Sequence, residues 1–231
     1  MATREPSYAP ATVWDAYFQD RTAAGNELNP QGWWVPAFWP QLGAHQAQTL
    51  LDLGCGMGGD ALSLAHDGVQ VTGVDYSAVA VARARAKAEA AGLPITFLHA
   101  DMAEPLPFAA ASFDAVMSNV ALHSFPDRLT RQIVGEITRV VKPGGLLLLH
   151  VNSTQDMPYR AAYRERVREL EPNFYLEAHG QTMRFFSEEY LRAVLAAWDL
   201  LELTHVPLQD AAGQTFKCVW RCVARKPSAT R

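Results

Sequence analysis

The stretch from Thr49 to Ala65 reads as a buried strand, a glycine turn and the start of a helix in direct succession. Three leucines end the strand, and a helical face begins with Ala61 and Leu62. Between them, glycines at positions 54, 56, 58 and 59 permit positive φ and let a ligand approach the backbone closely. Such a turn points backbone N–H groups at a ligand, so the segment predicts a binding site at the end of a strand.

Two nucleotide-binding patterns fit this turn. Gly54, Gly56 and Gly59 have the G-x-G-x-x-G spacing of dinucleotide sites. Asp75 follows about 20 residues later, where such sites have a ribose-binding acid. Asp52, however, is a carboxylate placed two residues before the first glycine. A fixed negative charge there repels a pyrophosphate and attracts a ligand with an ammonium or sulfonium group.

The run Asp52-Leu53-Gly54-Cys55-Gly56-Met57-Gly58 resembles the first motif of the class I S-adenosylmethionine-dependent methyltransferases, acid-x-Gly-x-Gly-x-Gly. The resemblance implies transfer of a methyl group from S-adenosyl-L-methionine to a small molecule, with S-adenosyl-L-homocysteine as product. Two other classes stay open. An NAD-dependent oxidoreductase shares only the glycines and one acid, whereas a catalytically silent S-adenosylmethionine-binding protein would keep the same core motifs.

The rest of the chain alternates strands and helices, as a parallel sheet with helices on both faces requires. We expect strands near 49–53, 70–75, 95–98, 113–118, 145–151, 200–206 and 215–224, and helices near 59–67, 77–91, 128–141 and 187–197. The last two strands are joined by a loop too short for a crossover helix, so they should be antiparallel. The predicted fold is a doubly wound, mostly parallel seven-stranded sheet with one antiparallel strand near the C-terminus, the Rossmann-like methyltransferase fold.

The family resemblance assigns cofactor-binding roles to residues that follow the strand ends. Asp75 would accept from the ribose hydroxyls, or simply cap the helix that begins near Ser77, and both roles can hold at once. The resemblance places Tyr76 against the adenine, Asp101 at its amino group and Met102 at its ring. The full expected cofactor set is Asp52, Gly54, Cys55, Gly56, Asp75, Tyr76, Asp101, Met102, Asn119 and Val120.

Acceptor residues are expected in three places. His123 follows the fourth strand and is the candidate for catalytic proton transfer, or a wall of the pocket. Residues 1–48 contain four tryptophans, at 14, 33, 34 and 39, and form either a cap over the cleft or a helix packed on the sheet. The domain proper would be 49–231, with an acceptor-site insertion at about 152–186 that includes a helix, Tyr159 to Leu170, and a loop, His179 to Phe186. Trp33, Tyr159 and Arg184 are the expected acceptor contacts, although a surface ion pair is the alternative for Arg184.

Composition limits the partners. The chain has 231 residues, a formal charge of −4 and a pI near 6.0, and it has no lysine- or arginine-rich run, so duplex nucleic acid is a poor substrate candidate. It has no apolar run long enough to span a membrane and no secretory signal, which predicts a cytoplasmic protein. Its three cysteines do not make a disulfide framework, and no metal site is expected. Nothing in the sequence identifies the acceptor atom as O, S, N, C or a chalcogen, or the oligomeric state.

Overall fold

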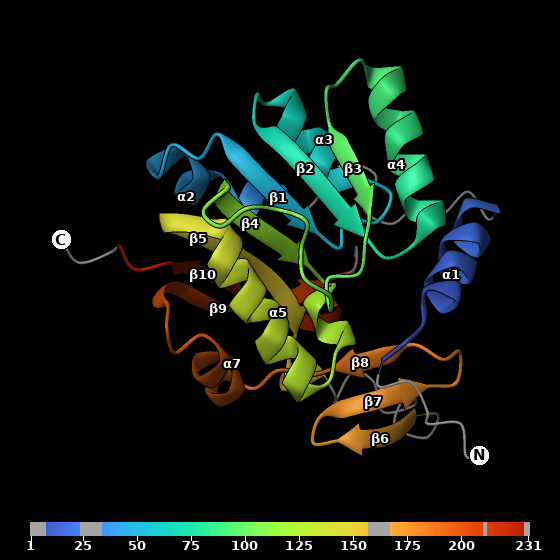
Figure 1. The fold of residues 1–231 in the computed structure, drawn as a ribbon. Coiled ribbons are helices and arrows are strands. Elements are labelled where there is room, and N and C mark those ends of the chain that lie inside the picture. Colours follow the sequence, from blue (N-terminus) through green and yellow to red (C-terminus); the bar gives the residue numbers. More distant parts are fainter. Residues whose placement is uncertain (1–7, 24–33, 157–166, 210–211, 229–231) are drawn as a thin grey trace.

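The computed structural model describes residues 8–23, 34–156, 167–209 and 212–228. Its centre is a seven-stranded sheet (Figure 1). In spatial order the strands are β3 (Thr96–His99), β2 (Gln70–Asp75), β1 (Thr49–Leu53), β4 (Phe113–Asn119), β5 (Val141–Asn152), β10 (Thr215–Arg225) and β9 (Asp199–Gln209). The pairs from β3 to β5 are parallel, while β10 is antiparallel to both β5 and β9. The expected mostly parallel sheet with one reversed strand is confirmed.

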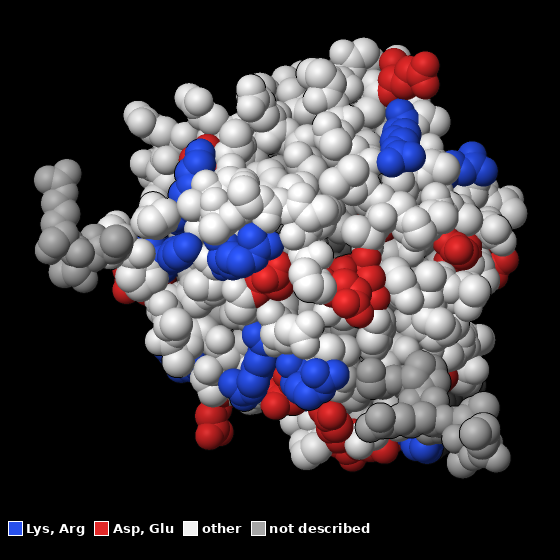
Figure 2. Space-filling model, viewed as in Figure 1, with Lys and Arg blue, Asp and Glu red and all other residues white. Residues whose placement is uncertain are grey.

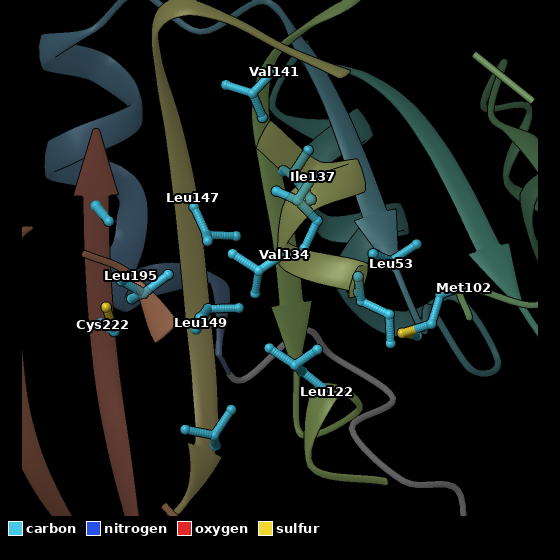
Figure 3. Close-up of a cluster of buried hydrophobic side chains, with 14 of the residues drawn as sticks. Leu53, Met102, Leu122, Val134, Ile137, Val141, Leu147, Leu149, Leu195 and Cys222 are labelled. Atoms are coloured by element: carbon cyan, nitrogen blue, oxygen red, sulfur yellow. The ribbon is translucent and has the colours of Figure 1, made fainter. Parts of the chain in front are cut away.

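Helices cover both faces of this sheet, because its strands carry apolar side chains on both sides. One face packs against α5 (Asp127–Val140) and α7 (Glu188–Val194), and Figure 3 shows side chains from β5 and α5 in this cluster. The other face packs against α3 (Gly59–His66), α4 (Ala78–Ala91), the 3-10 helix η1 (Val35–Phe38) and α2 (Trp39–Ala44). A second 3-10 helix, η2 (Leu122–Ser124), follows β4.

The chain leaves the sheet in opposite directions on either side of β1. This strand pairs with β2 on one side and with β4 on the other, so the connections that follow β1 and β4 diverge. Such a switch point opens a crevice beyond the carboxyl ends of the strands. The glycine turn after β1 lies at this crevice.

The N-terminal segment divides between two places. Helix α1 (Ala11–Ala23) packs near the start of α4, at the edge of the crevice (Figure 1). In contrast, η1 and α2 lie on the sheet face, where Phe38 and Leu42 are buried. The sheet-packed arrangement describes η1 and α2, while a cap over the cleft stays a prediction for this segment.

The segment after β5 differs from the sequence expectation. Residues 157–166 lie outside the described residues, but Val167–Glu171 forms strand β6, where a helix reaching Leu170 was expected. It pairs with β7 (Phe174–Glu177), which pairs with β8 (Thr182–Arg184) inside the expected loop. Asn173 has a φ of 60° and closes the turn between β6 and β7. This hairpin overrides the helix preference of the Arg- and Glu-rich sequence.

Charges of both signs are mixed on the face of the molecule shown in Figure 2. On α5, for example, Arg131 pairs with Asp127 and Arg139 pairs with Glu136. Within the described residues, no helix is long and apolar enough to cross a membrane. The described part of the chain also has no cluster of His, Cys, Asp and Glu suited to a metal ion.

Candidate cofactor and acceptor site

In the glycine turn after β1, two glycines are packed closely against neighbouring side chains, and a third has more space beside it. A Cβ on Gly54 would lie 2.3 Å from the Cβ of Ala121, and one on Gly58 would lie 3.0 Å from that of Ala84. Gly56 has more room, since its nearest neighbour would be the Phe18 ring at 3.5 Å. All three have positive φ, of 82°, 83° and 51° for Gly54, Gly58 and Gly56. The turn therefore needs glycine for its conformation and, at Gly54 and Gly58, for space as well.

Beyond this turn lies a cavity of about 460 Å³. Most of the residues predicted to bind cofactor line it, together with the predicted catalytic residue. These are Gly54, Cys55, Gly56, Asp75, Tyr76, Met102, Asn119, Val120 and His123. The structure thus gathers side chains from the ends of β1, β2 and β4 around one space.

Asp75 is bound on both of its carboxylate oxygens. Oδ2 accepts from the backbone N–H of Gly56 at 2.8 Å, and Oδ1 accepts from that of Ser77 at 2.8 Å. Burial raises the pKa of Asp75, and these two N–H donors partly oppose the rise. Each carboxylate oxygen can accept a further hydrogen bond, so the helix contact and a ribose diol are compatible.

Asp52 is buried and does not line the cavity. Its Oδ2 atom is buried and has no hydrogen-bond partner. Burial raises the pKa of Asp52 well above its usual value, and the negative charges of Asp60 and Asp75 raise it further. The three carboxylates form an acidic cluster that favours a positive charge in the cavity.

Asp101 also does not line the cavity. Its Oδ1 accepts from the N–H of Ala103 at 2.8 Å, and its Oδ2 accepts from the hydroxyl of Tyr8 at 2.5 Å. Tyr8 itself lines the cavity. Burial and the Asp101 carboxylate together raise the pKa of Tyr8, so the phenol stays protonated and can hold this contact at neutral pH.

The remaining walls are rich in aromatic and thioether side chains. Helix α1 contributes Trp14, Tyr17 and Phe18, and Trp34 precedes η1. Arg21, Met57, Gln181, Met183 and Lys217 also line the cavity. Lys217 comes from the end of β10 that lies beside the carboxyl ends of the parallel strands, because β10 is reversed.

Val120 has an unusual backbone conformation beside the cavity. Its φ is 49°, in the left-handed region that a β-branched residue rarely adopts. The N–H of Val120 donates to the carbonyl of His150 at 2.8 Å, which holds this conformation in place. Backbone strain of this kind gathers at functional sites.

Arg184 does not line this cavity. Its guanidinium is buried and pairs with Glu171 at 2.6 Å, while its Nε donates to the carbonyl of Phe125 at 3.1 Å. It therefore joins β8 to the segment that follows η2. The ion pair expected as the alternative is present, but its arginine is buried and not on the surface. Trp33 and Tyr159, the other expected acceptor contacts, lie outside the described residues.

Sequence reasoning missed two residues that structure places at the site. Asp60, in the first turn of α3, lines the cavity and accepts from Nδ2 of Asn119 at 2.8 Å. His150, on β5, lies behind Asn119, with its Nδ1 at 2.8 Å from the Asn119 Oδ1. For His150, the available sequence signal was a single polar residue within the apolar run of β5.

Comparison with known proteins agrees with this geometry. Residues 50–145 match a family described as a methyltransferase domain. A malonyl-[acyl-carrier protein] O-methyltransferase of Enterobacter lignolyticus is 31% identical over 192 residues, 80% of this chain and 68% of that protein. A Methanosarcina mazei structure of a SAM-dependent methyltransferase aligns with a TM-score of 0.70 and 26% identity, covering 82% of this chain and 98% of that one.

An uncharacterised methyltransferase of Synechocystis is 37% identical over 102 residues, 44% of this chain and 46% of that protein. The chain thus spans about half the length of this relative. The protein belongs to the class I S-adenosylmethionine-dependent methyltransferases. S-Adenosyl-L-methionine is the cofactor of that family, and the turn, the acidic cluster and Asp75 suit its ribose and its cationic groups.

Proposed function

We propose that this protein transfers a methyl group from S-adenosyl-L-methionine to a small-molecule acceptor. The observation that carries the proposal is Asp75 at a glycine turn, in an acidic cluster with Asp60 on the wall of the same cavity and the buried Asp52. A diol acceptor beside a site that favours cations matches an adenosine with a sulfonium and an ammonium. The same cluster opposes the pyrophosphate of a dinucleotide, so no observation favours the oxidoreductase alternative.

The roles of individual residues follow from their places. Asp75 would hold the ribose hydroxyls, and Tyr76 and Met102 would pack on the adenine. Asp60, which accepts from Asn119, would receive the ammonium of the methionine end. The bound sulfonium supplies an activated methyl group with a neutral thioether as leaving group, so the protein mainly has to align the acceptor and exclude water.

The acceptor would occupy the part of the cavity that the cofactor contacts leave open. Trp14, Tyr17 and Trp34 give this part large apolar surfaces, and Met183 adds a polarisable one. This lining suits a small, flat molecule. His123 is buried and lines the cavity, which supports a role in taking a proton from an acceptor hydroxyl or acidic carbon.

Calorimetry tests the cofactor assignment. We expect the protein to bind S-adenosylhomocysteine, with no comparable affinity for NAD. Asp75→Ala should lose roughly 1.5–3 kcal/mol of binding free energy, the range for hydrogen bonds to a charged group. Asp67→Ala, an exposed carboxylate after α3, is the matched control and should bind as the wild type does.

Two outcomes would contradict this proposal. Tight binding of NAD without binding of S-adenosylhomocysteine would remove the cofactor assignment. Binding of S-adenosylhomocysteine without methyl transfer to any of a broad panel of neutral and anionic aromatic acceptors would favour the catalytically silent alternative.

A further inference from the structure

His150 is a buried histidine that does not line the cavity, yet it touches the residues that do. It pairs with Asn119 across the parallel β4–β5 ladder, and its side chain is 2% exposed. Its Nδ1 lies 2.8 Å from Oδ1 of Asn119, and Nδ2 of Asn119 donates to Oδ2 of Asp60 at 2.8 Å. These contacts form a chain, His150–Asn119–Asp60, that runs from the sheet interior to the cavity wall.

The chain has one consistent arrangement of protons. A carboxylate only accepts, so the Asn119 amide must turn its NH₂ toward Asp60 and its oxygen toward His150. An amide oxygen also only accepts, so the Nδ1 of His150 must carry a proton. Burial and the charge of Arg221 lower the pKa of His150 to about 3, which leaves the ring neutral with a single N–H. His150 is therefore the Nδ1–H tautomer, and this donor fixes the orientation of the Asn119 amide.

The N-terminal segment holds the imidazole in this position. The rings of Trp34 and Phe38 lie with their centroids 4.6 and 4.8 Å from that of His150. Trp34 also lines the cavity, so it contacts both the site and the group behind it. Asp60 lies in the first turn of α3, where the helix dipole favours its ionised form.

We propose that His150 is a positioning residue: by donating Nδ1–H to Asn119, it directs the Asn119 amide to Asp60 and holds that carboxylate for the ammonium group of the cofactor. This inference rests on the proposed cofactor site. Without the donor, the amide can reverse and present its oxygen to the Asp60 carboxylate, which would repel it. The buried Asn119 oxygen would also lose its partner.

Two substitutions separate the hydrogen bond from the packing of the ring. His150→Phe keeps an aromatic ring between Trp34 and Phe38 but removes the donor. His150→Asn loses the ring but places an amide N–H near the position of Nδ1. We expect His150→Phe to weaken the binding of S-adenosylhomocysteine about 10- to 100-fold in calorimetry, the range for leaving a buried polar group unpaired. His150→Asn should recover most of that affinity.

His205→Phe is the matched control. His205 also contacts a polar oxygen, at 3.0 Å from Ser153 Oγ, and its ring packs edge-on against that of Trp220, but it lies on β9 and does not line the cavity. It should leave the affinity unchanged. In an Asn119→Ala background, His150→Phe should have no further effect on affinity, because His150 would act only through that amide.

Nitrogen NMR of the ligand-free protein gives a readout that does not depend on activity. The wild-type His150 should show a protonated Nδ1 and an unprotonated Nε2, and Asn119→Ala should remove this preference. Equal affinity of wild type and His150→Phe would overturn the inference while leaving the cofactor assignment intact. Equal losses in His150→Phe and His150→Asn would also overturn it, in favour of packing. Failure of the wild-type protein to bind S-adenosylhomocysteine would overturn the proposed function itself, and this inference with it.

Discussion

At the scale of single residues, Asp52 is a buried carboxyl group whose ionisation is unfavourable in the folded protein. Its pKa is raised in the folded protein, so the carboxyl group stabilises the fold fully at pH values below its unfolded pKa. This contribution is lost as the pH rises through the raised folded pKa, because the buried group must then ionise beside Asp60 and Asp75. The ligand-free protein should therefore lose stability toward alkaline pH from this source.

Substitution of Asp52 by asparagine tests this electrostatic cost. Asp52→Asn should melt a few degrees above the wild type at pH 8, since each kcal/mol corresponds to about 2–4 °C in a domain of this size. The difference should vanish at low pH, where the wild-type carboxyl is protonated. The same variant should bind S-adenosylmethionine more weakly. A stability gain that is the same at both pH values would contradict the explanation, and Asp67→Asn serves as the exposed control.

Gly54 and Gly43 form a second residue-scale comparison. Gly54→Ala combines a left-handed φ with a Cβ contact of 2.3 Å, and should cost about 2–4 kcal/mol of unfolding free energy in denaturant titrations. Gly43 lies in α2 with no atom within 4 Å of an added Cβ, so Gly43→Ala should be neutral or stabilise by about 0.5–1 kcal/mol. Equal effects at both positions would show that the packing at Gly54 is not the cause.

The residues of the site were predictable to different degrees. Asp52, Gly54 and Asp75 lie at or directly after the ends of β1 and β2, in a spacing that the sequence displays, so their gathering could be foreseen. Asp60 and His150 could not, because their roles depend on which side chains face each other across α3, β4 and β5. Such pairings arise from packing and strand register, which local spacing does not encode.

At the scale of elements, α4 is a helix whose bounds could be predicted from local sequence signals alone. It was expected at 77–91 and spans Ala78–Ala91, with Ser77 accepting from the N–H of Ala80 at its start and Gly92 in a left-handed conformation at its end. Strand β6 shows the opposite case. Its Arg and Glu residues favour a helix locally, and only pairing with β7 through the turn at Asn173 makes it a strand.

The carboxylate of Asp15 joins helix α1 to the start of α4. Asp15 accepts from the hydroxyl of Ser77 at 2.6 Å and from the N–H of Val79 at 3.2 Å, at the start of α4. Asp15→Ala should lower the free energy of local opening of α1 by about 1–2 kcal/mol, seen as faster hydrogen exchange in that helix. The KM for S-adenosylmethionine should rise in parallel.

Asp20→Ala, an exposed position on the same helix, is the control for this prediction and should change neither measurement. Unchanged exchange in Asp15→Ala would mean that the aromatic contacts of Trp14, Tyr17 and Phe18 alone hold α1 in place.

At the scale of the whole molecule, a bound cofactor should stabilise the folded protein. The cavity is lined by residues of α1, α3, β2, β4, η2, β8 and β10, so a bound ligand joins elements from both ends of the chain. At 100 times its dissociation constant, S-adenosylhomocysteine should stabilise the protein by about 2.7 kcal/mol, or roughly 5–10 °C in melting temperature. Differential scanning calorimetry measures this shift, and NAD at the same concentration should give none.

The glycine turn also places a nucleophile of the protein itself, the thiol of Cys55, on the wall of the cavity. Burial raises the pKa of this thiol well above its usual value, and the charges of Asp75 and Asp52 raise it further. Since the thiolate is the reactive form of cysteine, Cys55 is chemically quiet at neutral pH. The carboxylates that favour a cation in the cavity would therefore also protect the protein from alkylation by a methyl-donating cation bound there.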